Sequence, residues 1–220
     1  MSTALVTGAN RGIGLEFCKQ LKASGYDVIA VCRQSAAELD ALGVQVETGV
    51  DMCDAASIKQ LAERLGNTTI DLLINNAGIM NNETLDNLDF ESIQKQWEVN
   101  TLGPLRVVDE LKHLMAAQGK IALITSRMGS IDDNGSGGYY GYRMSKAALN
   151  MAGVSMAHEL KDKGIAVGIL HPGFVSTDLT NNNGQINTDE SVTGLMARID
   201  ELNLDNSGTF WHMNGEVLPW

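Results

Sequence analysis

The stretch Thr7-Gly8-Ala9-Asn10-Arg11-Gly12-Ile13-Gly14 decides the fold. It follows the apolar run Ala4–Thr7 and leads into a helical pattern that continues to Ser24 and stops at Gly25. Glycines between a strand and a helix permit a tight turn and let the backbone approach a pyrophosphate, which the helix N-terminus attracts. The spacing Gly-x-x-x-Gly-x-Gly differs from the common Gly-x-Gly-x-x-Gly. The stretch predicts a dinucleotide site, and glycines that serve only the sterics of a turn are the alternative.

The rest of the chain alternates between strand and helix patterns. Further strands are predicted at 27–32, 44–50, 70–74, 120–125 and 165–170, with a last short one at 209–213. Helices are predicted at 55–65, 88–118 with an interruption near 103–104, 140–163 and 191–202. This alternation predicts an α/β fold of the doubly wound Rossmann type, a mostly parallel sheet of about seven strands with helices on both faces. One domain over residues 1–220 is expected, with a short C-terminal substrate region from about 174 to 220.

The composition is that of an acidic globular chain. The 220 residues carry 27 Asp and Glu against 16 Lys and Arg, which gives a formal net charge of −11. Such a surface repels phosphate backbones, so no nucleic-acid partner is expected. No apolar run is long enough for a membrane span and no basic region precedes the first apolar stretch, so we expect a cytoplasmic protein without a membrane partner. The three cysteines and four histidines show no metal-ligand spacing, and no metal is predicted.

Two arginines predict which dinucleotide is bound. NAD binders usually place an acid after the second strand, but here Asp27 comes before the apolar run and Arg33 follows it. Arg33, together with Arg11 from the glycine-rich turn, can pair with a 2′-phosphate. The cofactor predicted is therefore NADP(H), and two solvated surface arginines are the alternative.

Short polar motifs follow the third and fourth predicted strands. Asp51 and Met52 come after the third strand, where an acid can accept a hydrogen bond from the adenine amino group. Asn75-Asn76-Ala77-Gly78 follows the fourth strand, and its small residues let a cofactor lie close to the strand end. Both signals are weak alone because Asn and Gly are common turn residues.

Tyr142 and Lys146 form the candidate acid/base pair. They stand four residues apart in a predicted helix and so share one of its faces. A free phenol has a pKa of about 10 and is a poor base near neutrality, but a nearby ammonium favours the phenolate. Lowering the pKa to about 7 requires about 4 kcal/mol of stabilisation of the phenolate relative to the phenol, and the positive ring of an oxidised nicotinamide would contribute to this stabilisation. The alternative is a surface pair on an ordinary helix, which the spacing alone favours.

Two further polar residues complete the candidate site. Ser126 ends the fifth predicted strand, where its hydroxyl can hold a carbonyl oxygen near the phenol; a capping serine is the alternative. Asn100 lies within the long helical region, where its side chain or a disturbed carbonyl can hold water leading to the lysine. The substrate predicted is a small carbonyl or alcohol compound.

These segments together resemble the short-chain dehydrogenase/reductase family of the single-domain type, closest to the carbonyl-reductase-like branch that contains C-factor. The resemblance includes Pro172-Gly173-Phe174-Val175-Ser176-Thr177 and covers nearly the whole chain. It implies hydride transfer, with Ser126 orienting the substrate, Tyr142 exchanging the proton, Lys146 binding the ribose and Asn100 supporting a proton relay. The cofactor-binding residues expected are Gly8, Asn10, Arg11, Gly12, Ile13, Gly14, Arg33, Asp51, Met52, Asn76, Ala77, Gly78, Tyr142, Lys146, Pro172, Gly173, Val175 and Thr177.

The chain departs from this family pattern in two places. The segment between Ser126 and Tyr142 is longer than usual, and the part after Thr177 is short, which predicts a reduced substrate lid. An apolar pocket is expected from some of Met80, Met128, Tyr139, Phe174 and Trp211, although for Trp211 a core position is preferred. The alternative function is a C-factor-like signalling or redox-sensing protein with little turnover. Helices near 102–115 and 142–160 are candidates for pairing in a homodimer or homotetramer, by analogy alone.

Overall fold

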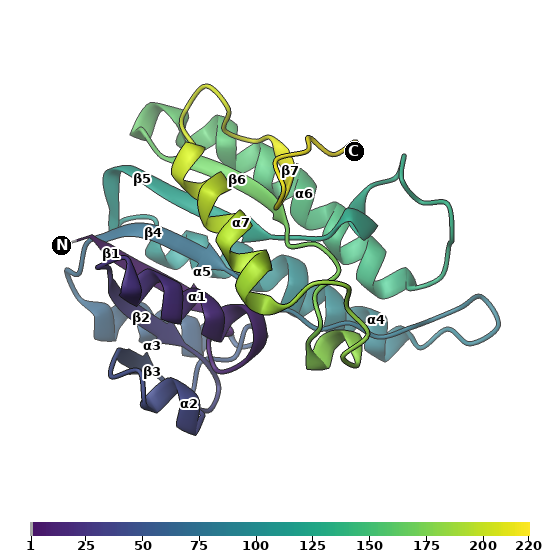
Figure 1. Ribbon diagram of the computed structural model, residues 1–220, viewed down its shortest axis with the longest axis horizontal. Coiled ribbons are helices and arrows are strands. Elements are labelled where there is room, and N and C mark those ends of the chain that lie inside the picture. Colours follow the sequence, from purple (N-terminus) through teal and green to yellow (C-terminus); the bar gives the residue numbers. More distant parts are fainter. Residues whose placement is uncertain (1) are drawn as a thin grey trace.

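Seven parallel strands form the centre of the protein in a computed structural model that describes residues 2–220 (Figure 1). The strand order is β3-β2-β1-β4-β5-β6-β7, and every neighbouring pair is parallel. This arrangement confirms the predicted doubly wound α/β fold. The strands are β1 (Thr3–Thr7), β2 (Asp27–Val31), β3 (Gln45–Glu47), β4 (Ile70–Asn75), β5 (Met115–Ile124), β6 (Ala166–His171) and β7 (Phe210–His212).

Helices cover both faces of this sheet. On one face α1 and α7 lie side by side, and Figure 1 shows them in front of the strands. The other face packs against α3, α5 and α6. Successive residues of β1 point to opposite faces of the sheet and pack into the hydrophobic core on each face. Leu5 lies in one core, and Ala4 and Val6 lie in the other. The helices are α1 (Gly12–Ala23), α2 (Ala37–Asp40), α3 (Ala55–Leu65), α4 (Phe90–Trp97), α5 (Gly103–Leu111), α6 (Tyr140–Leu160) and α7 (Thr188–Glu201).

The element boundaries differ from the sequence prediction in three places. The helix predicted to reach residue 118 ends at Leu111, and β5 begins at Met115 because Met115 pairs with Ile70 ahead of a register shift. The short helix α2 was not predicted, and β3 is shorter than the apolar pattern at 44–50. The interruption predicted near 103–104 lies earlier, because the π-helical segment η1 (Glu98–Leu102) separates α4 from α5, and Gly103 and Pro104 are the first residues of α5.

The switch point of the sheet lies between β1 and β4. The chain leaves β1 toward β2 on one side, while β4 continues the sheet on the other side. The glycine-rich turn after β1 and the Asn75–Gly78 segment after β4 therefore meet at one edge. Ligands of such sheets bind at this position, beyond the carboxyl ends of the strands.

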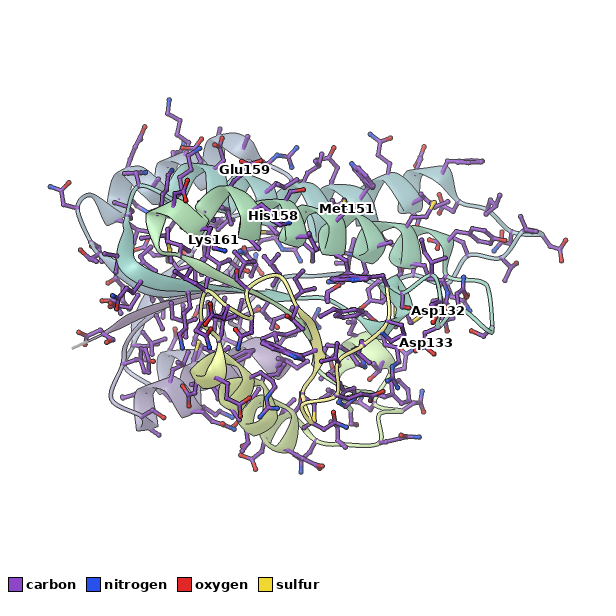
Figure 2. The ribbon with its side chains drawn as sticks, turned by 90° about the horizontal axis from the view of Figure 1, so that it is seen from above. Asp132, Asp133, Met151, His158, Glu159 and Lys161 are labelled. Atoms are coloured by element: carbon purple, nitrogen blue, oxygen red, sulfur yellow. The ribbon has the colours of Figure 1, made fainter. Side chains whose placement is uncertain are left out.

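The C-terminal segment lies against the loop that joins β5 to α6. β7 pairs with β6, and the Trp220 ring stacks on Phe210 with centroids 5.4 Å apart. The Trp220 carbonyl oxygen accepts hydrogen bonds from the backbone N–H groups of Ile131 and Asp132. Figure 2 shows Asp132 in this loop and Met151 farther along α6. Within residues 2–220, no helix has the length and apolar character needed to cross a membrane.

Candidate active site

A cleft of about 850 Å³ opens at the switch point, beyond the carboxyl ends of the strands. Its walls come from the turn after β1, the ends of β2 and β4, and the loop after β6. Most of the residues predicted to bind cofactor line this cleft, namely Gly8, Asn10, Arg11, Gly12, Ile13, Arg33, Asp51, Met52, Asn76, Ala77, Gly78 and Thr177. The structure thus brings together residues from both halves of the chain.

Different structural constraints favour glycine at positions 8, 12 and 14 of the first turn. A Cβ atom on Gly14 would lie 2.1 Å from the Gly8 carbonyl oxygen, and one on Gly8 would lie 2.8 Å from the Ala77 Cα atom. Gly12 instead has φ +54° and only the Thr177 side chain nearby, at 3.5 Å. Gly8 and Gly14 therefore allow the backbone of the turn to pack closely, while Gly12 faces the cleft at the start of α1. A bare turn at a helix N-terminus fits the pyrophosphate of a dinucleotide.

The two arginines predicted to read a 2′-phosphate differ in their surroundings. Arg33 is exposed at the rim of the cleft, and no side chain among residues 2–220 forms a hydrogen bond or ion pair with it. Arg11 forms an ion pair of 2.7 Å with Asp178 from the loop after β6. Because both members of this pair are largely exposed, the pair contributes little stability and can exchange partners.

Some predicted cofactor residues do not line the cleft. Five of them stand outside its lining: Tyr142, Lys146, Pro172, Gly173 and Val175, of which Val175 is 3% exposed. Gly14 also lies behind the turn. The Asn76 side chain donates to the carbonyl oxygens of Thr7 and Gly8, so it fastens the two loops together.

Sequence reasoning missed several cleft residues. Ser176, Leu179 and Asn182 from the loop after β6 and Glu38 from α2 line the cleft. No pattern in the sequence marked them, because their position depends on how a loop folds back over the turn after β1. For Asp178 the only signal available was its acidic charge within a polar loop.

Helix α6 places Tyr142 and Lys146 on its buried face. Tyr142 is 7% exposed and Lys146 is 3% exposed. The Lys146 Nζ atom lies 5.8 Å from the centroid of the Tyr142 ring and donates to the Ile124 carbonyl oxygen at 2.9 Å. A Cβ atom on Gly78 would come within 3.7 Å of that Nζ atom, so the ammonium lies behind Gly78, a residue of the cleft lining, while Lys146 and Tyr142 themselves are not part of that lining. The pair is not an exposed pair on an ordinary helix.

Burial sets the pKa values of this pair. Burial raises the pKa of Tyr142 to about 12, although a hydrogen bond with Ser126 acts in the opposite direction. Burial also lowers the pKa of Lys146 to about 8. Without cofactor the phenol therefore keeps its proton near neutral pH, contrary to the expectation of a lowered pKa, because burial of the phenol is the largest effect on its pKa.

Ser126 has two roles at the end of β5. Its hydroxyl accepts from the Met128 backbone N–H at 3.1 Å and so caps the short 3₁₀ helix η2 (Arg127–Gly129). The same side chain lies close enough to the Tyr142 phenol to lower its pKa, against the effect of burial. The capping alternative therefore holds together with the position next to the phenol.

Asn100 lies in the π-helical segment η1 and is fully buried. Its Oδ1 atom accepts from the Ile79 N–H at 2.9 Å, and its Nδ2 atom donates to the Ile79 carbonyl at 2.8 Å and to Ser145 Oγ at 3.0 Å. The Asn100 side chain therefore forms hydrogen bonds with both backbone groups of Ile79, the residue after Gly78. One of the two groups expected to hold water, the Asn100 side chain, is therefore already occupied by hydrogen bonds within the protein.

A second cavity of about 550 Å³ adjoins the first. Met80 and Tyr139, two of the residues expected to form an apolar pocket, line it together with Ile79 and Leu179. The other side of the lining is polar, so the cavity is mixed and not apolar; it includes Arg11, Asn81, Asn82, Asp178 and Asn181. Met128, Phe174 and Trp211 are not part of its lining. Trp211 packs partly buried against the core, which agrees with the preferred reading.

Two of the histidines lie together at the ends of β6 and β7. The rings of His171 and His212 meet edge to face with centroids 5.0 Å apart. Burial, with His212 and Arg127 nearby, lowers the pKa of His171 to about 3. No group of metal-ligating side chains occurs among residues 2–220.

The comparisons with known proteins agree with this geometry. The short chain dehydrogenase family model matches residues 2–188. A 1-hydroxy-2-glutathionyl-2-methyl-3-butene dehydrogenase from Rhodococcus sp. (strain AD45) is 42% identical, with 100% of both chains covered. The C-signal protein of Myxococcus xanthus is 41% identical over 69% of this chain and 93% of its own.

A solved structure extends the similarity to the whole fold. An NADPH-bound carbonyl reductase from chicken fatty liver superposes with a TM-score of 0.92 and 33% identity, covering 100% of this chain and 99% of its own. The family match, the parallel sheet and the buried Tyr142, Lys146 and Ser126 point the same way. The chain belongs to the short chain dehydrogenase family.

Proposed function

We propose that the protein is an NADP(H)-dependent oxidoreductase that interconverts a small carbonyl compound and its alcohol. The observation that carries the proposal is the buried cluster of Ser126, Tyr142 and Lys146, in which the Lys146 ammonium lies behind Gly78 of the cleft lining. When bound, the nicotinamide supplies or accepts the hydride. The second cavity gives the substrate a place beside Ile79 and Tyr139.

Each residue of the cluster has a separate task. Ser126 holds the substrate oxygen by a hydrogen bond next to the phenol, and Tyr142 gives its proton to that oxygen during carbonyl reduction. The raised pKa keeps the phenol protonated and ready for this step. Lys146 places a positive charge near the phenolate that forms, which stabilises it. In alcohol oxidation the same proton moves in the opposite direction.

Selectivity for NADP(H) over NAD(H) is proposed from the rim of the cleft. Arg33 and Arg11 are the cations that can reach a 2′-phosphate, and Arg33 has no competing acidic partner in the part of the chain that the structure describes. Support also comes from the chicken carbonyl reductase, which was solved with NADPH.

The names of the relatives suggest substrates to try first. The Rhodococcus relative is named for a hydroxyl compound that carries a glutathionyl group, and the chicken relative is named as a carbonyl reductase. A panel should therefore contain aldehydes, ketones, quinones and an alcohol with a neighbouring glutathione thioether. Residues of the region from about 174 to 220, in particular Leu179, are proposed to contact the substrate.

The C-signal relative supports a second candidate function, a signalling protein with little turnover. The complete set of Ser126, Tyr142, Lys146 and Asn100 favours catalysis, because binding a nucleotide does not require all four. Tight NADPH binding without NADPH oxidation across the whole panel would support the signalling role instead.

Tyr142→Phe tests the proposal, with Tyr140→Phe as a matched control on the same helix. NADPH at one hundred times its Kd should stabilise both variants and the wild type by about 2.7 kcal/mol. Turnover should fall by roughly 10² to 10⁴ in Tyr142→Phe only, as expected on loss of a general acid. Full turnover in Tyr142→Phe would refute the assigned role, and no stabilisation by NADPH would refute the cofactor.

A further inference from the structure

A buried acid that the proposed reaction does not use lies near the start of α6. Glu83, in the segment between β4 and α4, is 2% exposed. Its Oε1 atom accepts from Gln96 Nε2 at 2.6 Å and from Ser92 Oγ at 2.7 Å, and its Oε2 atom accepts from the Gly141 N–H at 3.2 Å. Gln96 is fully buried as well. Burying a carboxylate is costly unless it accepts hydrogen bonds, and Glu83 accepts them from Gln96, Ser92 and Gly141.

The direction of these hydrogen bonds is fixed at both ends by the backbone. The Asn81 N–H donates to Gln96 Oε1 at 3.0 Å, so the Gln96 amide must turn its NH₂ group toward Glu83. On the other side Glu83 meets the Gly141 N–H, which is also only a donor. The side chain at position 83 must therefore accept on both sides. An ionised carboxylate does this, whereas an amide of the same size would place its NH₂ group against one of two donors.

Glu83 also supplies the hydrogen-bond acceptors that the first turn of α6 lacks. Tyr139, at the N-cap position, has φ +52° and no side-chain hydrogen bond to the helix. The Glu83 carbonyl oxygen accepts from the Tyr139 N–H at 2.8 Å, and the carboxylate accepts from Gly141. A negative group at a helix N-terminus is favourable, because it faces the positive end of the dipole. Tyr142 is the residue that follows.

The packing around Gly141 shows how closely these parts fit. A Cβ atom on Gly141 would lie 2.4 Å from Gln96 Nε2 and 3.0 Å from the Ile93 Cα atom. α4 therefore packs directly against the first turn of α6, and the Glu83 carboxylate forms hydrogen bonds with both helices. We therefore expect a change in the hydrogen-bonding capacity of residue 83 to shift that turn.

We propose that Glu83 is a positioning residue for Tyr142, acting as an N-terminal cap of α6 that comes from a distant segment of the chain. The same residue fixes Tyr139 and the segment from Met80 to Asn82, which form one wall of the second cavity. This inference rests on the acid/base role proposed for Tyr142.

Exchanging the two side chains tests the proposal. In Glu83→Gln an NH₂ group faces a donor, and in Gln96→Glu two carboxylates face each other. In the double variant Glu83→Gln with Gln96→Glu, Asn81 donates to Glu at 96, Gln at 83 donates to the same carboxylate, and Gly141 donates to the Gln carbonyl. The double variant keeps the net charge and restores the donor–acceptor matches at Asn81, at Gly141 and between residues 83 and 96.

Steady-state kinetics and NADPH titration should be measured on all three variants with Tyr142→Phe in parallel. We expect each single variant to lose roughly ten- to hundredfold in kcat, because small shifts of a reacting group have such effects. The NADPH Kd should stay within about twofold, and the double variant should recover to within about threefold of the wild-type kcat. Loss of kcat without loss of cofactor binding is a result that general destabilisation would not produce.

Wild-type kcat in Glu83→Gln, or a double variant as impaired as the singles, would overturn the proposal. If the single variants do not fold, the double variant decides alone: recovery supports the proposal, and failure to fold or a low kcat overturns it. An active Tyr142→Phe would instead refute the role of Tyr142, so the two failures are distinguishable.

Discussion

The Lys146 ammonium lies over the Tyr142 ring, 5.8 Å from its centroid, and is held there by a hydrogen bond to the Ile124 backbone. Both side chains are buried, so neither can exchange this contact for water. Burial shifts the two pKa values in opposite directions, to about 8 for Lys146 and about 12 for Tyr142. Over the neutral range the lysine is therefore the first of the two to lose its proton.

The pH dependence of carbonyl reduction should follow Lys146. Below about pH 8 the amine is charged and kcat/KM should be level; above it the charge is lost and kcat/KM should fall by about tenfold per pH unit. Tyr142 stays protonated over this range and does not cause the fall. Lys146→Met should be slow at every pH and lack the inflection. An unchanged inflection in that variant would assign it to another group.

Gly14→Ala should disrupt the turn after β1. The new Cβ atom would lie 2.1 Å from the Gly8 carbonyl oxygen and 2.6 Å from Asn76 Nδ2, and the backbone cannot yield cheaply. We expect a loss of about 1 to 3 kcal/mol in the free energy of unfolding, measured with urea, and weaker NADPH binding. Gly135→Ala is the control, because a Cβ there meets nothing within 4 Å. Equal stability of the two variants would contradict the close packing.

Arg33→Ala should reduce the preference for NADPH. The side chain is exposed at the cleft rim, so its removal should leave the fold intact and raise the KM for NADPH about tenfold while the KM for NADH stays the same. Arg64→Ala, which removes an arginine paired with Glu47 outside the cleft lining, is the control. Equal effects of Arg33→Ala on both nucleotides would show that Arg33 does not read the 2′-phosphate.

His171 should make the fold sensitive to mild acid. Its pKa is about 3 in the folded protein and about 6.5 when unfolded, so from pH 6.5 downward the unfolded state binds a proton that the folded state does not. Stability should thus fall as the pH falls. Between pH 7 and 5, His171→Asn should lose less stability than the wild type, by about 1 to 2 kcal/mol in urea unfolding. The exposed His113→Asn controls for the substitution itself; an equal loss in all three would exclude His171.

Most of the fold could be predicted because it depends on local patterns. Strands buried on both faces read as apolar runs, as at Ile70–Asn75, and the glycine-rich turn marks where the first helix begins. The start of β5 could not be predicted, because it depends on pairing between Met115 and Ile70. Tertiary pairing overrides the local preference there.

The candidate catalytic residues could be proposed from spacing, but their electrostatics could not. Tyr142 and Lys146 share a helix face in any α-helix, whereas the direction of the phenol pKa depends on how deeply the face is buried. Glu83 gave no signal, because its partners Gln96 and Gly141 come from elements that only the fold brings together. Asp178 was missed for the same reason.

The residues proposed to select the nucleotide and those proposed to transfer the proton come from different parts of the chain. Everything proposed to distinguish one nucleotide from another belongs to β1, β2 and the turns after them, while the groups proposed to handle the proton come from the end of β5, α6 and the π-helical segment. The two sets meet only at the switch point, around Gly78. An engineer could therefore recode nucleotide preference in the first fifty or so residues without redesigning the chemistry, and natural variation could tune the two independently in the same way.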